Sequence, residues 1–271
     1  MKSLPRRTLA SPVEFSGIGV FSGGGTVVRL IPAEEPNGII FVVGDTFIPL
    51  AIENVLDLPN RTALAANESR VEVVEHLLAC LHIAGVTDLI IECPAGEVPL
   101  LDGSALPIWR VIEKGGLKDI PGYIAPLVAH SPVYVEGDEA VLIALPADEL
   151  RVSYFLAYDD PRIGCEHTSL IISEETFAGE IVPARSFIEA ERVQRLVEDG
   201  VVKSTDASQA LVVYPDGVRG AFRVEKEFAK HKILDLIGDL YLTGRPVHGH
   251  FIGLRSGHGL NREMIRKIIT M

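Results

Sequence analysis

Three side chains in the second half of the chain, His231, Asp235 and Asp239, recur at intervals of four residues. In a helix this spacing places all three on one face. Asp235 and Asp239 would repel each other there unless a cation lies nearby, so the pattern predicts a metal ion or a protonated histidine beside them. For an isolated motif, a solvated acidic face or a plain histidine–aspartate hydrogen bond is the simpler explanation, and it stays open at this point.

Glu75 and His76 form a second pair that suits a metal site. A catalytic zinc ion takes three protein ligands, keeps one position for water and needs a carboxylate nearby as general base. His76 could be such a ligand and Glu75 the base. A site built from His76 and Cys80 is the alternative, but Cys80 lies among leucines, where a buried free thiol is the commoner outcome. His82 projects away from His76 and is predicted to be structural.

A third candidate, His258, lies in the segment RSGHGLN at residues 255–261, just before a terminal helical run. A histidine there can donate a proton to a leaving amine, or stabilise an oxyanion, if a carboxylate keeps it charged. Asp239 could be that carboxylate. A helix-start histidine without a catalytic role is the alternative.

Alternating apolar runs and turn signals predict an α+β fold for the elements that position these residues. In the first half we expect strands at 26–30, 38–43 and 89–93, and helices at 71–83 and 107–113. In the second half we expect strands at 133–134, 140–145 and 150–156, and helices at 186–198 and 225–242.

The order of strands, helices and turns recurs between the two halves, most clearly in the helix–glycine–strand segments that begin at Glu75 and Lys230. We interpret this as a weak internal duplication, in which two helices face each other and each presents one histidine. Any helix–glycine–strand unit would look similar, so that alternative remains. The turn-rich segment 115–126 is the best boundary, and we predict two domains, residues 1–120 and 121–271.

Composition excludes several classes of function. With 25 basic and 37 acidic residues the net charge is −12, which argues against nucleic acid as a partner. The glycine-rich segment 17–25 matches neither a dinucleotide fingerprint nor a P-loop, so hydride and phosphoryl transfer have no support. Three cysteines without paired spacing predict no disulfide framework. No apolar run is long enough to span a bilayer or to act as a signal peptide, and we expect a cytoplasmic protein.

Five blocks of sequence, in this order, resemble the UDP-3-O-acyl-N-acetylglucosamine deacetylases. The blocks are VEHLL at Val74, EVPLLDGSALP at Glu97, ARSF at Ala184, HKILDLIGDLYL at His231 and SGHGLN at Ser256. The resemblance spans nearly the whole chain. It implies two similar α+β domains, each a helix layer on a β-sheet, packed helix to helix with a zinc site at the interface.

The resemblance also implies roles for individual residues. It makes His76, His231 and Asp235 the zinc ligands, Glu75 the general base, His258 the residue that stabilises the oxyanion or protonates the amine, and Asp239 its partner. Lys232 and Phe187 match positions that contact substrate in the family. Ser186 stands where the family usually has Thr, so a hydroxyl remains for the bound carbonyl.

The implied reaction is zinc-dependent hydrolysis of the acetamide of UDP-3-O-acyl-N-acetylglucosamine, the committed step of lipid A synthesis, by a monomer. Iron(II) suits two histidines and one carboxylate as well as zinc does. Phe21 stands where the family commonly has His, Val73 where Thr is usual, and Ser204, Thr205 and Asp206 replace a Gly-Gly-Ser near the expected acyl passage. The alternatives are a paralogous deacetylase for a different N-acetylated sugar and a metal-binding protein without turnover.

Overall fold

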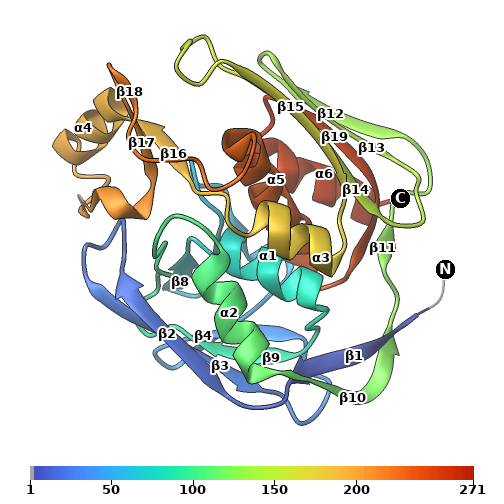
Figure 1. Ribbon diagram of the computed structural model, residues 1–271. Coiled ribbons are helices and arrows are strands. Elements are labelled where there is room, and N and C mark those ends of the chain that lie inside the picture. Colours follow the sequence, from blue (N-terminus) through green and yellow to red (C-terminus); the bar gives the residue numbers. More distant parts are fainter. Residues whose placement is uncertain (1–2, 205) are drawn as a thin grey trace.

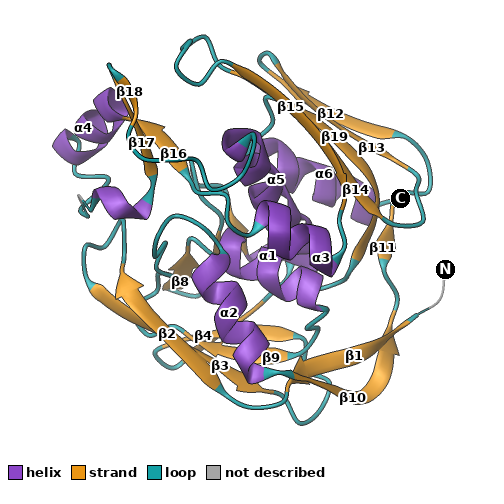
Figure 2. Ribbon diagram, in the orientation of Figure 1, coloured by secondary structure: helices purple, strands orange, loops and turns teal. Residues whose placement is uncertain are grey.

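The computed structural model describes residues 3–204 and 206–271, and it contains two large sheets with helices between them (Figures 1 and 2). The first sheet has the order β2-β3-β9-β4-β5, and the second has the order β12-β13-β19-β14-β15, with β11 also paired to β19. The first sheet consists of β2 (Val13–Ile18), β3 (Gly25–Pro32), β9 (Leu89–Glu92), β4 (Ile39–Val43) and β5 (Thr46–Pro49). The second consists of β12 (Val133–Gly137), β13 (Ala140–Leu145), β19 (Val247–Leu254), β14 (Leu150–Ala157), β15 (Cys165–Ile171) and β11 (Leu127–Val128).

The two sheets share strand directions as well as strand order. In the first, β3 runs antiparallel to the middle strand β9 and β4 runs parallel to it. In the second, β13 runs antiparallel to the middle strand β19 and β14 runs parallel to it. Each middle strand follows one helix and precedes another: α1 (Glu75–Ala84) and α2 (Leu106–Gly115) flank β9, whereas α5 (Glu227–Leu240) and α6 (His258–Ile269) flank β19. This repeated topology is what an internal duplication would produce.

Helices α1 and α5 pack against each other in the middle of the molecule (Figure 1). Gly238 of α5 makes this close approach feasible, because a Cβ atom there would lie only 2.1 Å from the carbonyl oxygen of Glu75 in α1. Thus any larger residue at 238 would collide with the backbone of the partner helix. The crossing places the start of α1 beside the C-terminal half of α5.

Buried apolar side chains from both halves form one continuous cluster around these helices. The predicted boundary at 120/121 falls within β10 (Leu117–Ile124), which pairs with β1 (Leu4–Leu9) of the first half. The division into residues 1–120 and 121–271 stays a prediction.

A smaller unit lies apart from both sheets at the upper left of Figure 1. It comprises β16 (Phe187–Glu189), α4 (Ala190–Glu198), β17 (Leu211–Tyr214) and β18 (Gly217–Val218). Helix α4 is amphipathic, yet none of its residues is fully buried. The remaining elements are β6 (Val55–Leu56), β7 (Ala63–Ala66), β8 (Ser69–Glu72), α3 (Glu174–Thr176), a π-helical turn (Phe177–Ile181) and 3-10 turns at Ile52–Asn54, Ala207–Gln209 and Tyr241–Thr243.

Two predicted helix starts are wrong. The helix expected from residue 71 begins at Glu75, because Val71 and Glu72 pair within the small β6-β7-β8 sheet and Val73 has a φ of 62°, outside the helical region. The helix expected from Ser186 begins at Ala190, because residues 187–189 form β16 and pair with β17. In both cases residues that helical periodicity assigned to the first turn of a helix belong instead to a short strand.

Candidate metal and acid–base site

His76 of α1 meets His231 and Asp235 of α5 where the two helices cross. One ligand atom from each residue can be chosen so that all three atoms lie within 4.8 Å of one another. Nε2 of His76 is 3.7 Å, and Nε2 of His231 is 3.3 Å, from Oδ1 of Asp235. All three side chains are buried. The sequence spacing that predicted His231 and Asp235 on one helical face is therefore matched, and His76 joins them from the other helix.

The chemistry of these donors fits a divalent metal ion. Ligand atoms about 2.0–2.1 Å from a tetrahedral zinc ion lie roughly 3.4 Å apart, close to the two nitrogen–oxygen distances here. Nδ1 of His231 faces the carbonyl oxygen of Ala184 at 3.3 Å, which fixes the tautomer that leaves Nε2 free to bind a metal. Burial lowers the pKa of His231 to about 3, so its ring is neutral at pH 7. The alternative donor, Cys80, does not join this cluster; burial raises the pKa of its thiol, and its Sγ lies 3.8 Å from the carbonyl oxygen of Ala105.

Lys232 stabilises the ionised form of Asp235. Its Nζ donates to Oδ2 of Asp235 at 2.7 Å, whereas the two histidines face Oδ1. Burial alone would raise the pKa of Asp235, but the interactions with its cationic and imidazole neighbours outweigh it and hold that pKa well below its usual range; at pH 7, where His231 is neutral, Lys232 is the charged partner. The carboxylate therefore stays charged whether or not a metal is bound.

Glu75 precedes His76 at the start of α1 and lines the same cavity. Its Oε2 accepts a hydrogen bond from the backbone N–H of Thr62 at 3.0 Å. Burial raises the pKa of Glu75, and a raised carboxyl pKa suits a group that must take up a proton near neutral pH.

His258 and Asp239 form a pair next to the donors, in which Asp239 is fully buried and His258 is partly exposed. Nδ1 of His258, the first residue of α6, lies 2.8 Å from Oδ2 of Asp239. Burial alone would lower the pKa of His258, but the charge of Asp239 and its hydrogen bond, with smaller contributions from Asp235 and Glu75, raise it to about 9. His258 is therefore protonated at pH 7. Asn261 also donates to Oδ2 of Asp239, at 2.8 Å.

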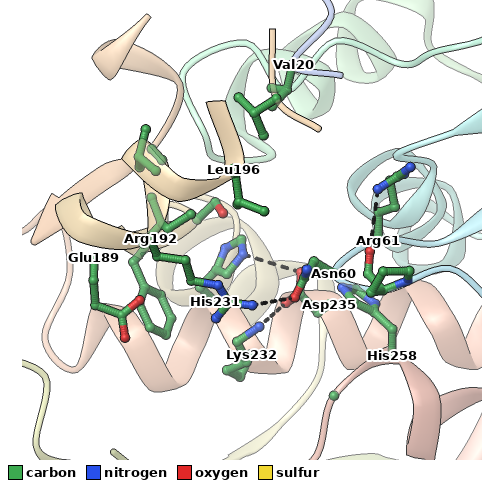
Figure 3. Close-up of a pocket in the computed structure, with 18 of the residues that line it drawn as sticks. Val20, Asn60, Arg61, Glu189, Arg192, Leu196, His231, Lys232, Asp235 and His258 are labelled. Carbon is green, nitrogen blue, oxygen red and sulfur yellow. Dashed lines mark hydrogen bonds and ion pairs between the residues drawn. The ribbon is translucent and has the colours of Figure 1, made fainter. Parts of the chain in front are cut away.

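A cavity of about 1520 Å³ is lined by the three donors, Lys232, Glu75 and His258, and it extends beyond them (Figure 3). Figure 3 shows His231, Lys232 and Asp235 projecting from one helix, with His258 beside them. Ser186 and Phe187, both predicted from the family resemblance, line the cavity, and Lys232 lies 5.7 Å from the centre of the Phe187 ring. One flank is apolar and is contributed by Val20 and by residues of α4 and its loop, namely Val193, Leu196, Val197, Val201 and Val202.

The positions that depart from the family pattern also lie at this cavity. Phe21 and Val73 line it, and the guanidinium of Arg61 stacks on the Phe21 ring at 3.8 Å. Ser204 lines it too, with its Oγ 2.6 Å from Oε1 of Gln209, and so does Asp206. Thr205 lies outside the described residues.

Some residues of the site gave no signal in the sequence. Thr62 contacts Glu75, Asp239 and His258, although no metal or acid–base motif includes it. Asn261 is a second example, because the segment RSGHGLN drew attention only to its histidine. His82, predicted to be structural, is buried and bonds to the backbone of Ile237 and Val247.

Comparison with known proteins gives one consistent result. A family model described as LpxC, UDP-3-O-acyl N-acetylglycosamine deacetylase, matches residues 6–270. The chain is similar to proteins named UDP-3-O-acyl-N-acetylglucosamine deacetylase from three organisms. It is 35% identical to the protein of Leptospira biflexa, over 98% of this chain and 90% of the relative, and 36% identical to that of Chlamydia caviae, over 98% of this chain and 97% of the relative. It is 34% identical to the protein of Thermodesulfovibrio yellowstonii, over 97% of this chain and 91% of the relative. Among the helices of the described residues, none has the length and hydropathy to cross a membrane.

Proposed function

Because this match covers nearly the whole chain, the protein belongs to the UDP-3-O-acyl-N-acetylglucosamine deacetylase family, and we propose that it is a zinc-dependent enzyme that hydrolyses the acetamide of that nucleotide sugar. The family places the reaction in lipid A synthesis. The observation that carries the proposal is a single cavity lined by three converging metal donors, Glu75 and His258, with Asp239 paired to His258 behind the cavity wall.

His76, His231 and Asp235 would hold the metal ion, with zinc preferred and iron(II) an alternative on the same donors. When bound, the ion acts as a Lewis acid toward the acetamide carbonyl and lowers the pKa of a water molecule at its open position. Lys232, by neutralising the outer oxygen of Asp235, keeps Oδ1 of that residue directed at the two histidines.

Glu75 would begin the chemistry by taking a proton from the attacking water. The water oxygen then bonds to the acetamide carbon, and the carbonyl electrons move onto its oxygen to give a tetrahedral oxyanion. A hydroxyl at Ser186, which lines the cavity, would donate a hydrogen bond to that oxyanion. The serine thus keeps the hydroxyl that a threonine would supply.

His258 would complete the reaction as the general acid. Its charge is stabilised by Asp239, and its Nδ1 is engaged by that carboxylate, so Nε2 is the nitrogen available to give a proton to the leaving nitrogen. The carbon–nitrogen bond breaks, which releases acetate and the sugar amine. Protonated Glu75 is the alternative donor.

The cavity also suits the rest of the proposed substrate. Arg192 and Arg255, which line the cavity, would supply positive charge for a nucleotide diphosphate, although the chain as a whole is acidic. Phe187 and Lys232 would contact the sugar, and the apolar flank formed with α4 would hold the acyl chain. Ser204 and Asp206 line the same cavity, so they would narrow the acyl passage or make it more polar than glycine would.

The larger architecture belongs to the same proposal. Two α+β domains of matching topology would pack through α1 and α5, and the metal site would lie at their junction. The expected monomeric state and cytoplasmic location complete the description of the enzyme.

The test is acetate release from a panel of UDP-N-acetylglucosamines with and without a 3-O-acyl chain. We expect turnover of the acylated compounds and little of the others. Preferred turnover of the compound without an acyl chain would favour a paralogous deacetylase, which the departures at Phe21 and Val73 in the cavity wall could serve. Metal binding without acetate release from any compound would contradict the proposed function.

A further inference from the structure

Thr62 lies between the proposed base and the proposed acid, and it is fully buried. Its backbone N–H donates to Oε2 of Glu75 at 3.0 Å. Its hydroxyl donates to Oδ1 of Asp239, and the same Oγ1 is 3.2 Å from Nδ1 of His258. One small side chain and its own amide therefore contact all three proton-handling groups.

We propose that Thr62 is a positioning residue that couples Glu75 to the Asp239–His258 pair. This inference rests on the proposed function, because it assigns Thr62 its role through what those groups do. The amide of Thr62 occupies Oε2 of Glu75, so Oε1 is the oxygen left to take the proton. The hydroxyl of Thr62 occupies Oδ1 of Asp239 and leaves Oδ2 to hold His258.

The segment around Thr62 is itself fixed to two of the three helices that carry these groups, α1 and α6. The carbonyl oxygen of Thr62 accepts from the N–H of Val74, the residue before α1, at 3.3 Å. Arg262 of α6, whose side chain is almost fully buried, reaches Asp57 at 3.0 Å and the carbonyl oxygen of Arg61 at 3.4 Å. Thr62 is therefore held in place from both sides, as a positioning role requires.

Unlike Thr62, Asn261 contacts only one of the three groups, Asp239. It donates to Oδ2 of Asp239 at 2.8 Å, on the opposite oxygen from Thr62. His258 also contacts Oδ2, so both oxygens of the Asp239 carboxylate have hydrogen-bond partners. Removal of the Thr62 hydroxyl would take away the hydrogen bond that Oδ1 accepts from it. A buried carboxylate that loses a donor rotates or changes its hold on its other partner.

The experiment compares two substitutions. Thr62→Val removes the hydroxyl but keeps the shape of the side chain and the backbone amide. Thr62→Ser keeps the hydroxyl and the amide and removes only the methyl group. Thr87→Val is the matched control, because the hydroxyl of Thr87 also donates to a buried aspartate, Asp88, at 2.6 Å, away from the site. We expect Thr62→Val to lower kcat by roughly 10- to 100-fold with KM changed by less than about twofold. Thr62→Ser should remain near the wild-type rate, and Thr87→Val should lose stability without losing kcat.

A second measurement does not depend on turnover. The Nδ1–H proton of His258 in its bond to Asp239 gives a downfield NMR resonance, assigned by its loss in His258→Gln. We expect this resonance to move or broaden in Thr62→Val and to stay in place in Thr62→Ser and Thr87→Val. If Thr62→Val does not fold, Thr62→Cys, with a weak S–H donor, takes its place and should show the same changes to a smaller extent.

The outcomes separate this inference from the proposed function. A wild-type protein that releases no acetate would overturn the function, and the resonance would then decide whether Thr62 holds the His258–Asp239 pair. With an active wild type, an unchanged kcat in Thr62→Val would overturn the inference. So would a loss of kcat in Thr87→Val as large as that in Thr62→Val, because the effect would then follow from stability alone.

Discussion

Nδ1 of His258 lies 2.8 Å from Oδ2 of Asp239, although one residue begins α6 and the other lies near the end of α5. The contact joins a helix start to the helix that carries two of the three metal donors. It keeps the imidazole charged, with a pKa of about 9, where burial alone would lower that pKa. Protonation at this position therefore depends on a specific partner, which makes it testable.

The first prediction concerns the basic limb of the pH profile. The pKa of His258 is raised from 6.5 to about 9, so the contribution of the pair to the free energy of unfolding is fully present below about pH 6.5 and is lost as the pH rises through about 9. If His258 is the acid, kcat/KM for acetate release should fall over the same range. Asp239→Asn removes the charge, so the limb should move to lower pH. A limb that stays in place in this variant would show that another group sets it.

The second prediction concerns removal of the metal. A chelator should abolish acetate release but leave the far-ultraviolet circular dichroism unchanged, because Lys232 still neutralises Asp235 and the apolar core is continuous without the ion. Added zinc should restore the rate. Full turnover in protein shown by elemental analysis to contain no metal would contradict a catalytic ion.

The third prediction separates the roles of two adjacent residues. Glu75→Ala should lower kcat by about 10² to 10⁴, the usual contribution of a positioned general base, while metal content stays near that of the wild type. His76→Ala should instead lose metal, because it removes a donor. Metal content measured on both purified variants, alongside kcat, decides the matter, and the opposite pattern would mean that the two assignments are reversed.

The fourth prediction concerns acyl-chain length. Ser204→Gly should raise kcat/KM for longer 3-O-acyl chains relative to shorter ones, because it removes a Cβ and a hydroxyl from the cavity wall. Each methylene buried in an apolar passage contributes about 0.8 kcal/mol, so two further methylenes would change the preference by roughly tenfold. Ser208→Gly, an exposed position of the same loop, is the control. An unchanged preference in Ser204→Gly would place the acyl chain elsewhere. The same kcat/KM measurement on Thr205→Gly tests the neighbouring position.

The fifth prediction concerns stability in acid. His82 of α1 is buried against α5 and β19, where Nδ1 is 3.1 Å from the carbonyl oxygen of Ile237 and Nε2 accepts from the N–H of Val247 at 3.1 Å. Burial lowers its pKa to about 4, so its stabilising contribution is present above about pH 6.5 and is lost as the pH falls toward 4, by on the order of 3 kcal/mol.

Urea unfolding at pH 7 and pH 5 measures this contribution. His82→Gln should be less stable at pH 7 and should lose less stability than the wild type between the two values. His130→Gln, at an exposed position, should follow the wild type. Equal pH dependence in wild type and His82→Gln would mean that other groups cause the acid lability.

Several parts of the fold follow from local pattern. Four-residue spacing predicted that His231, Asp235 and Asp239 share a face of one helix, and α5 does present the first two to one cluster of donors and the third to His258. Strand 140–145 was placed correctly because AVLIAL is a short continuous apolar run bounded by polar and turn-forming residues. Family membership, expected from five sequence blocks, is established by a match over residues 6–270.

Other parts depend on contacts that no local pattern encodes. The start of α1 was misplaced because Val73 adopts a left-handed φ that its β-branched side chain disfavours, and only the surrounding structure can impose it. Thr62 could not be predicted because its partners lie 13 residues away at Glu75 and 177 residues away at Asp239. Local periodicity fixes which face a side chain occupies, whereas the identity of the opposing residue depends on how the helices cross.

Gly238, where α5 touches the backbone of Glu75, sets the distance between the two helices that carry the metal donors, so metal binding depends on that distance. The donors come from both sides of this contact, so a displacement of one helix by even a fraction of an ångström stretches the nitrogen–oxygen spacings on which coordination depends. Metal affinity thus acts as a gauge of interhelical spacing. We therefore expect substitutions far from the site that loosen the packing of α1 on α5 to weaken metal binding at the proposed site before they measurably lower the free energy of unfolding.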